Sequence, residues 1–464
     1  MVKKFLVIFL LFTALFLRAW KIDYIPFQSD GDELAYVFAG QSLLEKGMPI
    51  SWSSFDYPSS YHYQKFTLGD EKYNAVDTFQ MIKPWFDHPF VLPIVIGGWA
   101  EAWGYHFPSI PPSSILRWPM LLFAGLTLYM VYALAKEWFG YWSGIFSLFL
   151  ISFSPILIFS QRMVIGENLV TPFLLTAIYL AVKQKKVAWP VLFSLLAALS
   201  KFTGLIAVPI LTIYYILHKE YKRAAVYVIA SLGIFALVYG GYGYALGWEQ
   251  FLAAFAYQSH RLIGWSNPAF ILQSPGFHHF IVLDMSYYLI LLLGMAPLLF
   301  PKTKLKPKDV FLLLTVFILF VTIWATSAEQ DLLGWYKIPL FTMMAISAGQ
   351  VVVNSVVPTG VLFLLWVTVI NNFGLVRYPT HPLPEAMSLR FVLAAIFGVT
   401  GFGITFDGTK WGKMLVNASL VCSLSAYLIS SFYVTTRYYQ AFCRDRRCPV
   451  PFMSVKEVLQ MKRK

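Results

Sequence analysis

The stretch MVKKFLVIFLLFTALFLRAW (Met1–Trp20) is apolar over about the length of one membrane-spanning helix, and similar runs recur as far as residue 433. A helix needs about 20 apolar residues to cross the hydrocarbon layer. The chain has 464 residues, of which 58% are hydrophobic and 13% charged; soluble domains have about 45–50% and about 25%. Its mean hydropathy is +0.63. The runs are too long for barrel strands of about 10 residues, so we predict an all-α polytopic membrane protein with roughly 11 to 13 spans.

The first run has the basic start and apolar middle of a signal peptide. Its end is crowded by Phe16, Leu17, Arg18 and Trp20, so it lacks the small residues of a cleavage site. We therefore expect a retained first span with the N-terminus in the cytoplasm.

The net charge of +13 comes mostly from short basic loops beside the apolar runs. KQKK (183–186), HKEYKR (218–223) and PKTKLKPK (301–308) are typical of cytoplasmic loops, because membrane proteins concentrate Lys and Arg on that side. Topology thus explains the charge, and we expect no nucleic-acid partner. Three cysteines are too few for a disulfide scaffold.

Counting outward from these basic loops places four elements on the outer face. They are a long first loop from Lys21 to Asp87, in which we expect short helices, the loop 246–284, the turn 327–337 and a hinge near Lys201. Four apolar runs lie between Asp87 and the KQKK cluster, where an odd number of crossings is required, so one run must be broken. Pro155 marks the expected break, since proline removes a helix hydrogen bond.

Two acidic clusters flank the first outer loop. Asp32 and Glu33 follow the first span, and Asp87 and His88 precede the next apolar run. If the loop folds back onto the bundle, both clusters meet at the membrane boundary and form one pocket. The alternative is that these side chains are simply solvated.

Ionisable residues interrupt two further apolar runs. Lys201 is flanked by apolar sequence, where a charge normally faces a partner or a water-filled cavity, unless it reaches the interface from a helix end. We predict that it binds phosphate. Arg162 and Glu167 follow the expected break, and they either pair with each other or contact substrate.

The turn 327–337 adds Glu329, Tyr336 and Lys337 as candidate binding residues, although Tyr at a membrane interface is ordinarily an anchor. His278, His279 and Asp284 are a weak candidate for a divalent metal site, because adjacent histidines point in different directions. No other cofactor is indicated.

Six stretches occur in this order along the chain: DELAYVFAGQSLLEKGMPISW, DHPFVLPIV, LRWPMLLFAGLTLYMVYALAKEWFG, SPILIFSQRMVIGENL, LSKFTGLIAVP and GWYKIPLFTMMAISAG. Their order resembles the GT-C superfamily of polytopic glycosyltransferases, especially relatives of the protein O-mannosyltransferases and the lipid A aminoarabinose transferase. The similarity covers about residues 1–355.

This resemblance implies roles for individual residues. Asp32 matches the family's catalytic base, with Glu33 as its neighbour. His88 matches a His-Pro-Pro motif, in which this chain has Phe90 at the third position. The remaining matches are Glu167, where the family often has aspartate, the lysine Lys201, and a Tyr-x-x-Pro pattern at Tyr336 and Pro339.

The sequence therefore predicts a GT-C type helical bundle whose catalytic module spans residues 1–355, including the outer loop 21–87. Additional spans are expected over 356–433, followed by a basic tail over 434–464. The implied function is transfer of a sugar from a polyprenyl-phosphate donor to a lipid, glycan or protein acceptor. The reaction is expected to invert the sugar's configuration, on the outer face of the cell membrane. A transporter or lipid flippase is the alternative, because intramembrane charges also line transport paths.

Overall fold

The computed structural model describes residues 2–22, 32–70, 75–259, 271, 285–299, 305–326, 334–354, 358–377, 398, 401, 405 and 409–443. The N-terminal part is built from α1 (Val2–Ala19), α2 (Asp32–Lys46), β1 (Ser51–Trp52), η1 (Ser59–Tyr61), β2 (His62–Asp70), β3 (Ala75–Ile82), α3 (Val91–Ala102), α4 (Ser113–Phe139), α5 (Tyr141–Ser152), α6 (Pro155–Ser160) and α7 (Glu167–Val182). The rest comprises α8 (Ala188–Ser200), η3 (Phe202–Ile206), α9 (Ala207–Leu217), α10 (Tyr221–Leu246), α11 (Trp248–Ser259), α13 (Ser286–Leu299), α14 (Pro307–Thr326), η4 (Gly334–Lys337), α15 (Ile338–Asn354), α16 (Pro358–Arg377) and α18 (Lys410–Cys443).

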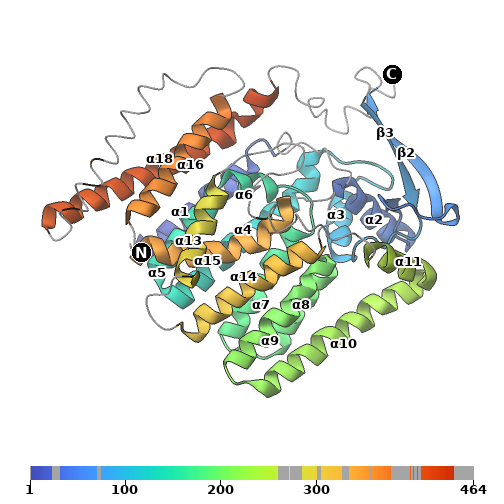
Figure 1. Cartoon of the computed structure of the whole chain (residues 1–464). Coiled ribbons are helices and arrows are strands. Elements are labelled where there is room, and N and C mark those ends of the chain that lie inside the picture. Colours follow the sequence, from blue (N-terminus) through green and yellow to red (C-terminus); the bar gives the residue numbers. More distant parts are fainter. Residues whose placement is uncertain are drawn as a thin grey trace.

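The helices pack side by side in an elongated bundle (Figure 1). Among the described residues, 5 helices are long and apolar enough to cross a membrane. They lie in α4, α10, α14, α18 and the continuous run of η4 with α15. The described residues also contain shorter apolar helices of 10–17 residues. The protein is thus an integral membrane protein with the predicted all-α architecture, and broken helices contribute much of its apolar length.

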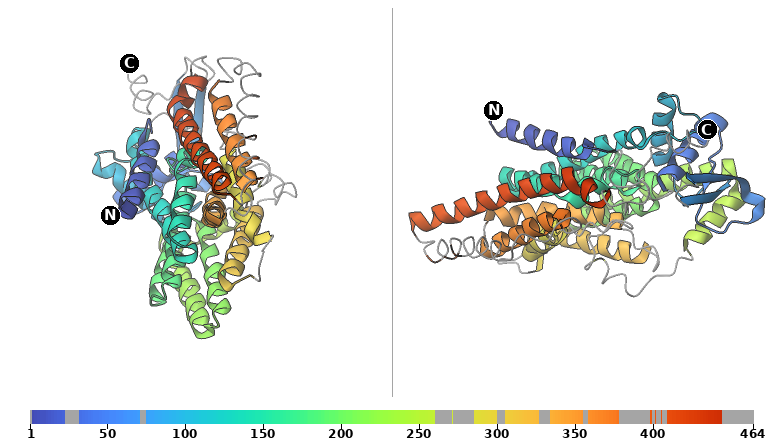
Figure 2. Two further views of the ribbon diagram at one scale, coloured as in Figure 1. Left: turned by 90° about the vertical axis from the view of Figure 1, so that its left-hand side faces the viewer. Right: turned by 90° about the horizontal axis from the view of Figure 1, so that it is seen from above.

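The first outer loop differs from the prediction of short helices alone. It contains α2 and η1, but also a three-stranded antiparallel sheet in the order β1-β3-β2. The β2–β3 pair is in register with Phe66 opposite Phe79. The sheet and α11 lie at one end of the bundle (Figure 2).

Two glycines bring α2 and α3 into close contact. A Cβ at Gly40 would lie 1.9 Å from the carbonyl oxygen of Pro93, and one at Gly97 would lie 2.4 Å from the backbone nitrogen of Gln41. Only glycine allows the two backbones to approach this closely. The crossing fixes α2 against α3.

The two helix breaks predicted from the sequence are present. Pro155 begins the short helix α6 after α5 has ended at Ser152. Lys201 lies in extended conformation between α8 and η3. The polar side chains described below lie at these breaks, so the breaks position the candidate site.

The C-terminal helices α16 and α18 pack against each other. α18 runs past the expected module boundary at residue 433 and continues to Cys443. Of the predicted basic tail 434–464, residues 444–464 lie outside the described residues.

Candidate functional site

A buried ion pair fixes the beginning of α2. Arg117 donates from Nε to Glu33 Oε1 over 3.0 Å and from NH2 to Glu33 Oε2 over 2.8 Å. The two residues are 0% and 1% exposed. The third guanidinium nitrogen donates to the carbonyl oxygen of Ile22 over 2.8 Å, which ties the end of α1 to the same point. Arg117 therefore compensates the charge of Glu33 and joins α1, α2 and α4.

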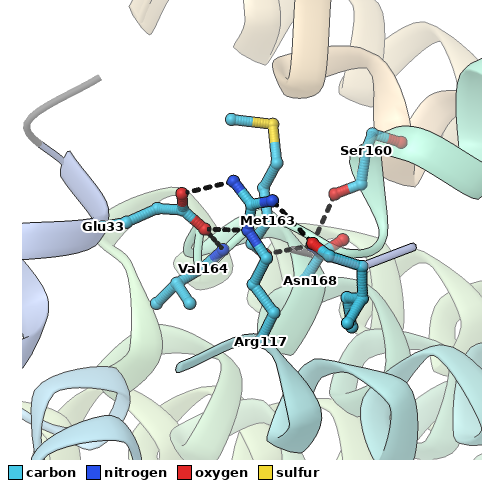
Figure 3. A network of polar contacts seen from close by, with 7 residues as sticks. Glu33, Arg117, Ser160, Met163, Val164 and Asn168 are labelled. Atoms are coloured by element: carbon cyan, nitrogen blue, oxygen red, sulfur yellow. Dashed lines mark hydrogen bonds and ion pairs between the residues drawn. The ribbon is translucent and has the colours of Figure 1, made fainter. Parts of the chain in front are cut away.

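Glu33 also holds the unwound segment between α6 and α7. The backbone N–H of Val164 donates to Glu33 Oε1 over 2.9 Å. Asn168 closes the same segment from the other side, since its Nδ2 donates to the carbonyl oxygens of Ser160, over 2.9 Å, and Met163, over 2.7 Å. Figure 3 shows Glu33, Arg117 and Asn168 converging on this segment. Backbone groups released by the helix break thus find side-chain partners, as burial requires.

Two further arginines hold the unwound segment to α1. Arg18 donates from Nε to Gln161 Oε1 over 2.8 Å, and its other nitrogens bond to carbonyl oxygens that include those of Ile151 and Ser152. Arg162 donates from NH2 to the carbonyl oxygen of Leu17. The predicted alternative of an Arg162–Glu167 pair is not what the structure shows, because Glu167 pairs elsewhere.

Glu167 and Lys201 form the second buried ion pair. Lys201 Nζ lies 2.6 Å from Glu167 Oε1, and the same ammonium lies 4.4 Å from the centroid of the Tyr336 ring. A Cβ at Gly166 would come within 2.7 Å of Lys201 Cδ, so glycine leaves room for the lysine side chain. The structure therefore brings together three predicted site residues from α7, the hinge after α8 and η4.

A small cavity of about 20 Å³ adjoins this ion pair. That volume holds about one water. Its walls combine a carboxylate, hydroxyls and apolar groups, contributed by Glu167, Val170, Thr203, Ile206, Leu319, Thr322, Ile323, Thr326, Tyr336 and Pro339.

Asp87 lies in a separate polar cluster. Its carboxylate accepts hydrogen bonds from Ser53 Oγ over 2.5 Å and from the Tyr57 hydroxyl over 2.8 Å. Burial, reinforced by the negative charge of Asp87, raises the pKa of Tyr57 well above its usual value. Gln258 on α11 donates to the backbone carbonyl of Asp87 over 3.0 Å, which joins the first outer loop to the next one.

His88 packs its ring against aromatic side chains. The ring centroid lies 5.3 Å from that of Tyr36 on α2 and 5.8 Å from that of Trp85. The carboxylates of Glu33 and Asp87 therefore have different hydrogen-bond partners.

Asp32 occupies the first turn of α2 and is partly buried. An acidic side chain is favourable there because the helix dipole is positive at this end. The adjacent Glu33 is held by Arg117 and Val164, so the position of Asp32 is set by that lock.

The last turn of predicted residues is only partly described. Lys337 is 3% exposed, and its Nζ lies 5.3 Å from the centroid of the Tyr287 ring. Glu329 lies outside the described residues, as do His278, His279 and Asp284. Within the described ranges, no three His, Cys, Asp or Glu side chains come together as metal ligands.

Sequence reasoning did not single out Arg18 or Arg117 as site residues. Arg117 interrupts an apolar run, SSILRWPMLL, in the same way that Lys201 does. That signal would have identified it as a buried charge needing a partner.

Residues 87–240 match the family model described as dolichyl-phosphate-mannose-protein mannosyltransferase. No curated protein matches the chain in sequence. Two solved structures share the fold of this chain.

ArnT from Cupriavidus metallidurans bound to undecaprenyl phosphate superposes with a TM-score of 0.57 at 15% identity, covering 94% of this chain and 77% of that one. The oligosaccharyltransferase AglB from Archaeoglobus fulgidus, in complex with an inhibitory peptide and a dolichol-phosphate, gives 0.52 at 12% identity, covering 97% of this chain and 59% of that one. Residues 87–240 thus match a mannosyltransferase family model, and the chain shares its fold with these two solved structures.

Proposed function

We propose that the protein transfers a sugar from a polyprenyl-phosphate donor to a lipid, glycan or protein acceptor on the extracytoplasmic side of the membrane. The observation that carries this proposal is the lock of Glu33 onto Val164. It holds the first turn of α2, with Asp32, at one end of a short unwound segment. Three residues further along that segment, Glu167 pairs with Lys201. Asp32 and Lys201 are therefore both connected to this unwound segment, Asp32 through Glu33 and Lys201 through Glu167.

Asp32 acts as the general base in this proposal. It accepts the proton of the acceptor's nucleophilic group as that group forms a bond to the anomeric carbon. The bond between the anomeric carbon and the phosphate oxygen breaks, and its electron pair leaves with the phosphate. A single displacement of this kind inverts the anomeric carbon.

Cations near the departing phosphate stabilise the charge that develops there. Lys201 and Lys337 are the candidates, because both are largely buried beside aromatic rings. Arg162 donates a hydrogen bond to the carbonyl oxygen of Leu17, so its role in this proposal is to hold the unwound segment to α1. Asp87 and His88 support the outer loop, from which acceptor contacts are expected.

The orientation is supported by the basic turns. α7 runs from Glu167 to the KQKK turn, and α8 returns from it to Lys201. Because basic turns favour the cytoplasm, the Glu167–Lys201 end of these helices faces the other side. The solved enzymes support the donor class, since one is bound to undecaprenyl phosphate and the other to dolichol-phosphate.

Purified full-length protein in detergent tests the proposal. It is incubated with a panel of polyprenyl-phosphate sugars and extracted membrane lipids, glycans or peptides, and the products are separated and their anomeric configuration is determined by NMR. We expect transfer from at least one donor with inversion. A product with retained configuration would contradict the single displacement. Movement of the donor across vesicles without any transfer would favour the transporter alternative.

A further inference from the structure

The Glu167 carboxylate is only half satisfied. Its Oε1 receives Lys201 Nζ at 2.6 Å, whereas Oε2 is buried and has no hydrogen-bond partner within the described part of the chain. Glu167 is 2% exposed. A buried carboxylate oxygen without a donor costs free energy comparable to a lost hydrogen bond, or more. Such an atom indicates a donor group that the described residues do not supply.

The cavity beside Glu167 has the size and chemistry for one small donor group. Its volume of about 20 Å³ holds one water-sized group, such as a hydroxyl. The hydroxyl-bearing residues Thr203 and Thr322 line it together with apolar side chains such as Ile323. Tyr336, whose ring contacts Lys201, completes the wall.

The charge balance favours a neutral donor. Lys201 already neutralises Glu167, so a second cation at Oε2 would be repelled by the nearby ammonium. A hydroxyl donates one hydrogen bond without adding charge. We propose that this cavity recognises one hydroxyl of the donor's sugar through Glu167 Oε2, and so sets which sugar the enzyme accepts. This inference rests on the proposed function, because it requires a lipid-linked sugar as donor.

The test compares a donor with its analogues that each lack one sugar hydroxyl, using the full-length protein in detergent. For the hydroxyl that enters the cavity, we expect kcat/KM to fall about 10- to 100-fold, the range for a hydrogen bond to a charged group. The other deoxy donors should react nearly as the parent does.

Two variants link that discrimination to the cavity. Glu167→Gln changes the side chain that accepts the hydrogen bond from the sugar hydroxyl. Thr322→Leu fills the cavity without removing the Glu167–Lys201 pair. Both should use the parent donor and the critical deoxy donor at similar kcat/KM. Val321→Leu changes the neighbouring position on α14, which does not line the cavity, and should keep the wild-type discrimination. Thr322→Leu should also leave the Kd for sugar-free polyprenyl phosphate unchanged.

Each outcome decides between the alternatives. If transfer occurs but every deoxy donor reacts like the parent, a water fills the cavity. The inference then fails, whereas the proposed function stands. The inference also fails if Thr322→Leu retains the discrimination, or if an amino sugar is preferred through Glu167. If the wild-type protein transfers no sugar from any donor, the proposed function itself fails and this inference falls with it.

Discussion

Arg117 grips Glu33 with two parallel hydrogen bonds, although the two residues are 84 positions apart in the chain. The geometry is the fork of a guanidinium on a carboxylate, which lysine cannot reproduce. The pair also receives the Val164 backbone, so it connects the first turn of α2 to the unwound segment.

Breaking the Arg117–Glu33 pair should lower the free energy of unfolding. Arg117→Met leaves a buried carboxylate without its counter-charge, and we expect the free energy of unfolding to fall by about 3–5 kcal/mol. The measurement is thermal unfolding in detergent, followed by size-exclusion chromatography. Arg223→Met is the matched control, because Arg223 is 44% exposed in its pair with Glu220 and should contribute less than about 1 kcal/mol. Equal melting temperatures for the two variants would refute a stabilising role.

Asp32→Asn should abolish transfer while expression and membrane insertion stay normal. Loss of a general base typically lowers the rate by about 10²- to 10⁴-fold. Asp56→Asn makes the same chemical change at an exposed position of the same outer loop, and it should retain activity. Full activity of Asp32→Asn in the purified assay would remove Asp32 from the role of base.

The Glu167–Lys201 pair should show strong thermodynamic coupling. Lys201→Met alone leaves Glu167 charged and buried, so we expect a loss of about 3–5 kcal/mol in stability. Adding Glu167→Gln should recover much of that loss, since the double variant has no uncompensated charge, but it should not recover transfer. The surface pair Lys183–Glu137, with side chains 37% and 36% exposed, is the control for the cycle. Additive losses in the buried pair would show that the two side chains are not coupled.

The α2–α3 crossing gives a prediction with a neighbouring control. Gly97→Ala forces a methyl group against the backbone of Gly40 and Gln41, and overpacking of this kind costs about 1–3 kcal/mol or more. Gly98→Ala meets only Leu44 Cδ1 at 3.5 Å and should be neutral or slightly stabilising. Melting temperatures of the two variants check this. Similar values would mean that the helices can separate without loss.

The sequence predicts those parts of the fold that depend on local signals. Apolar run length gives the helices, Pro155 gives the break before α6, and the isolated charge of Lys201 gives the hinge. These features follow from one residue or one run, so no knowledge of distant contacts is needed.

Partner choice is what the sequence leaves open. The sequence offers many cations as partners for Glu33, and only the folded structure shows that Arg117 of α4 is the one. Glu167 likewise lies close to Arg162 in the sequence, but in the structure it pairs with Lys201. The sheet of the first outer loop was not predicted, although residues 66–68 and 79–81 alternate between apolar and polar, as strands do. Only the folded structure shows that these two segments pair, with Phe66 opposite Phe79.

The tight fit of Gly166 against the stem of Lys201 has a practical meaning for anyone wishing to retune substrate choice. Even alanine at position 166 would force the side chain of Lys201 to shift. Mutant libraries should therefore be directed to the α14 side of the cavity, at Thr322 and Thr326.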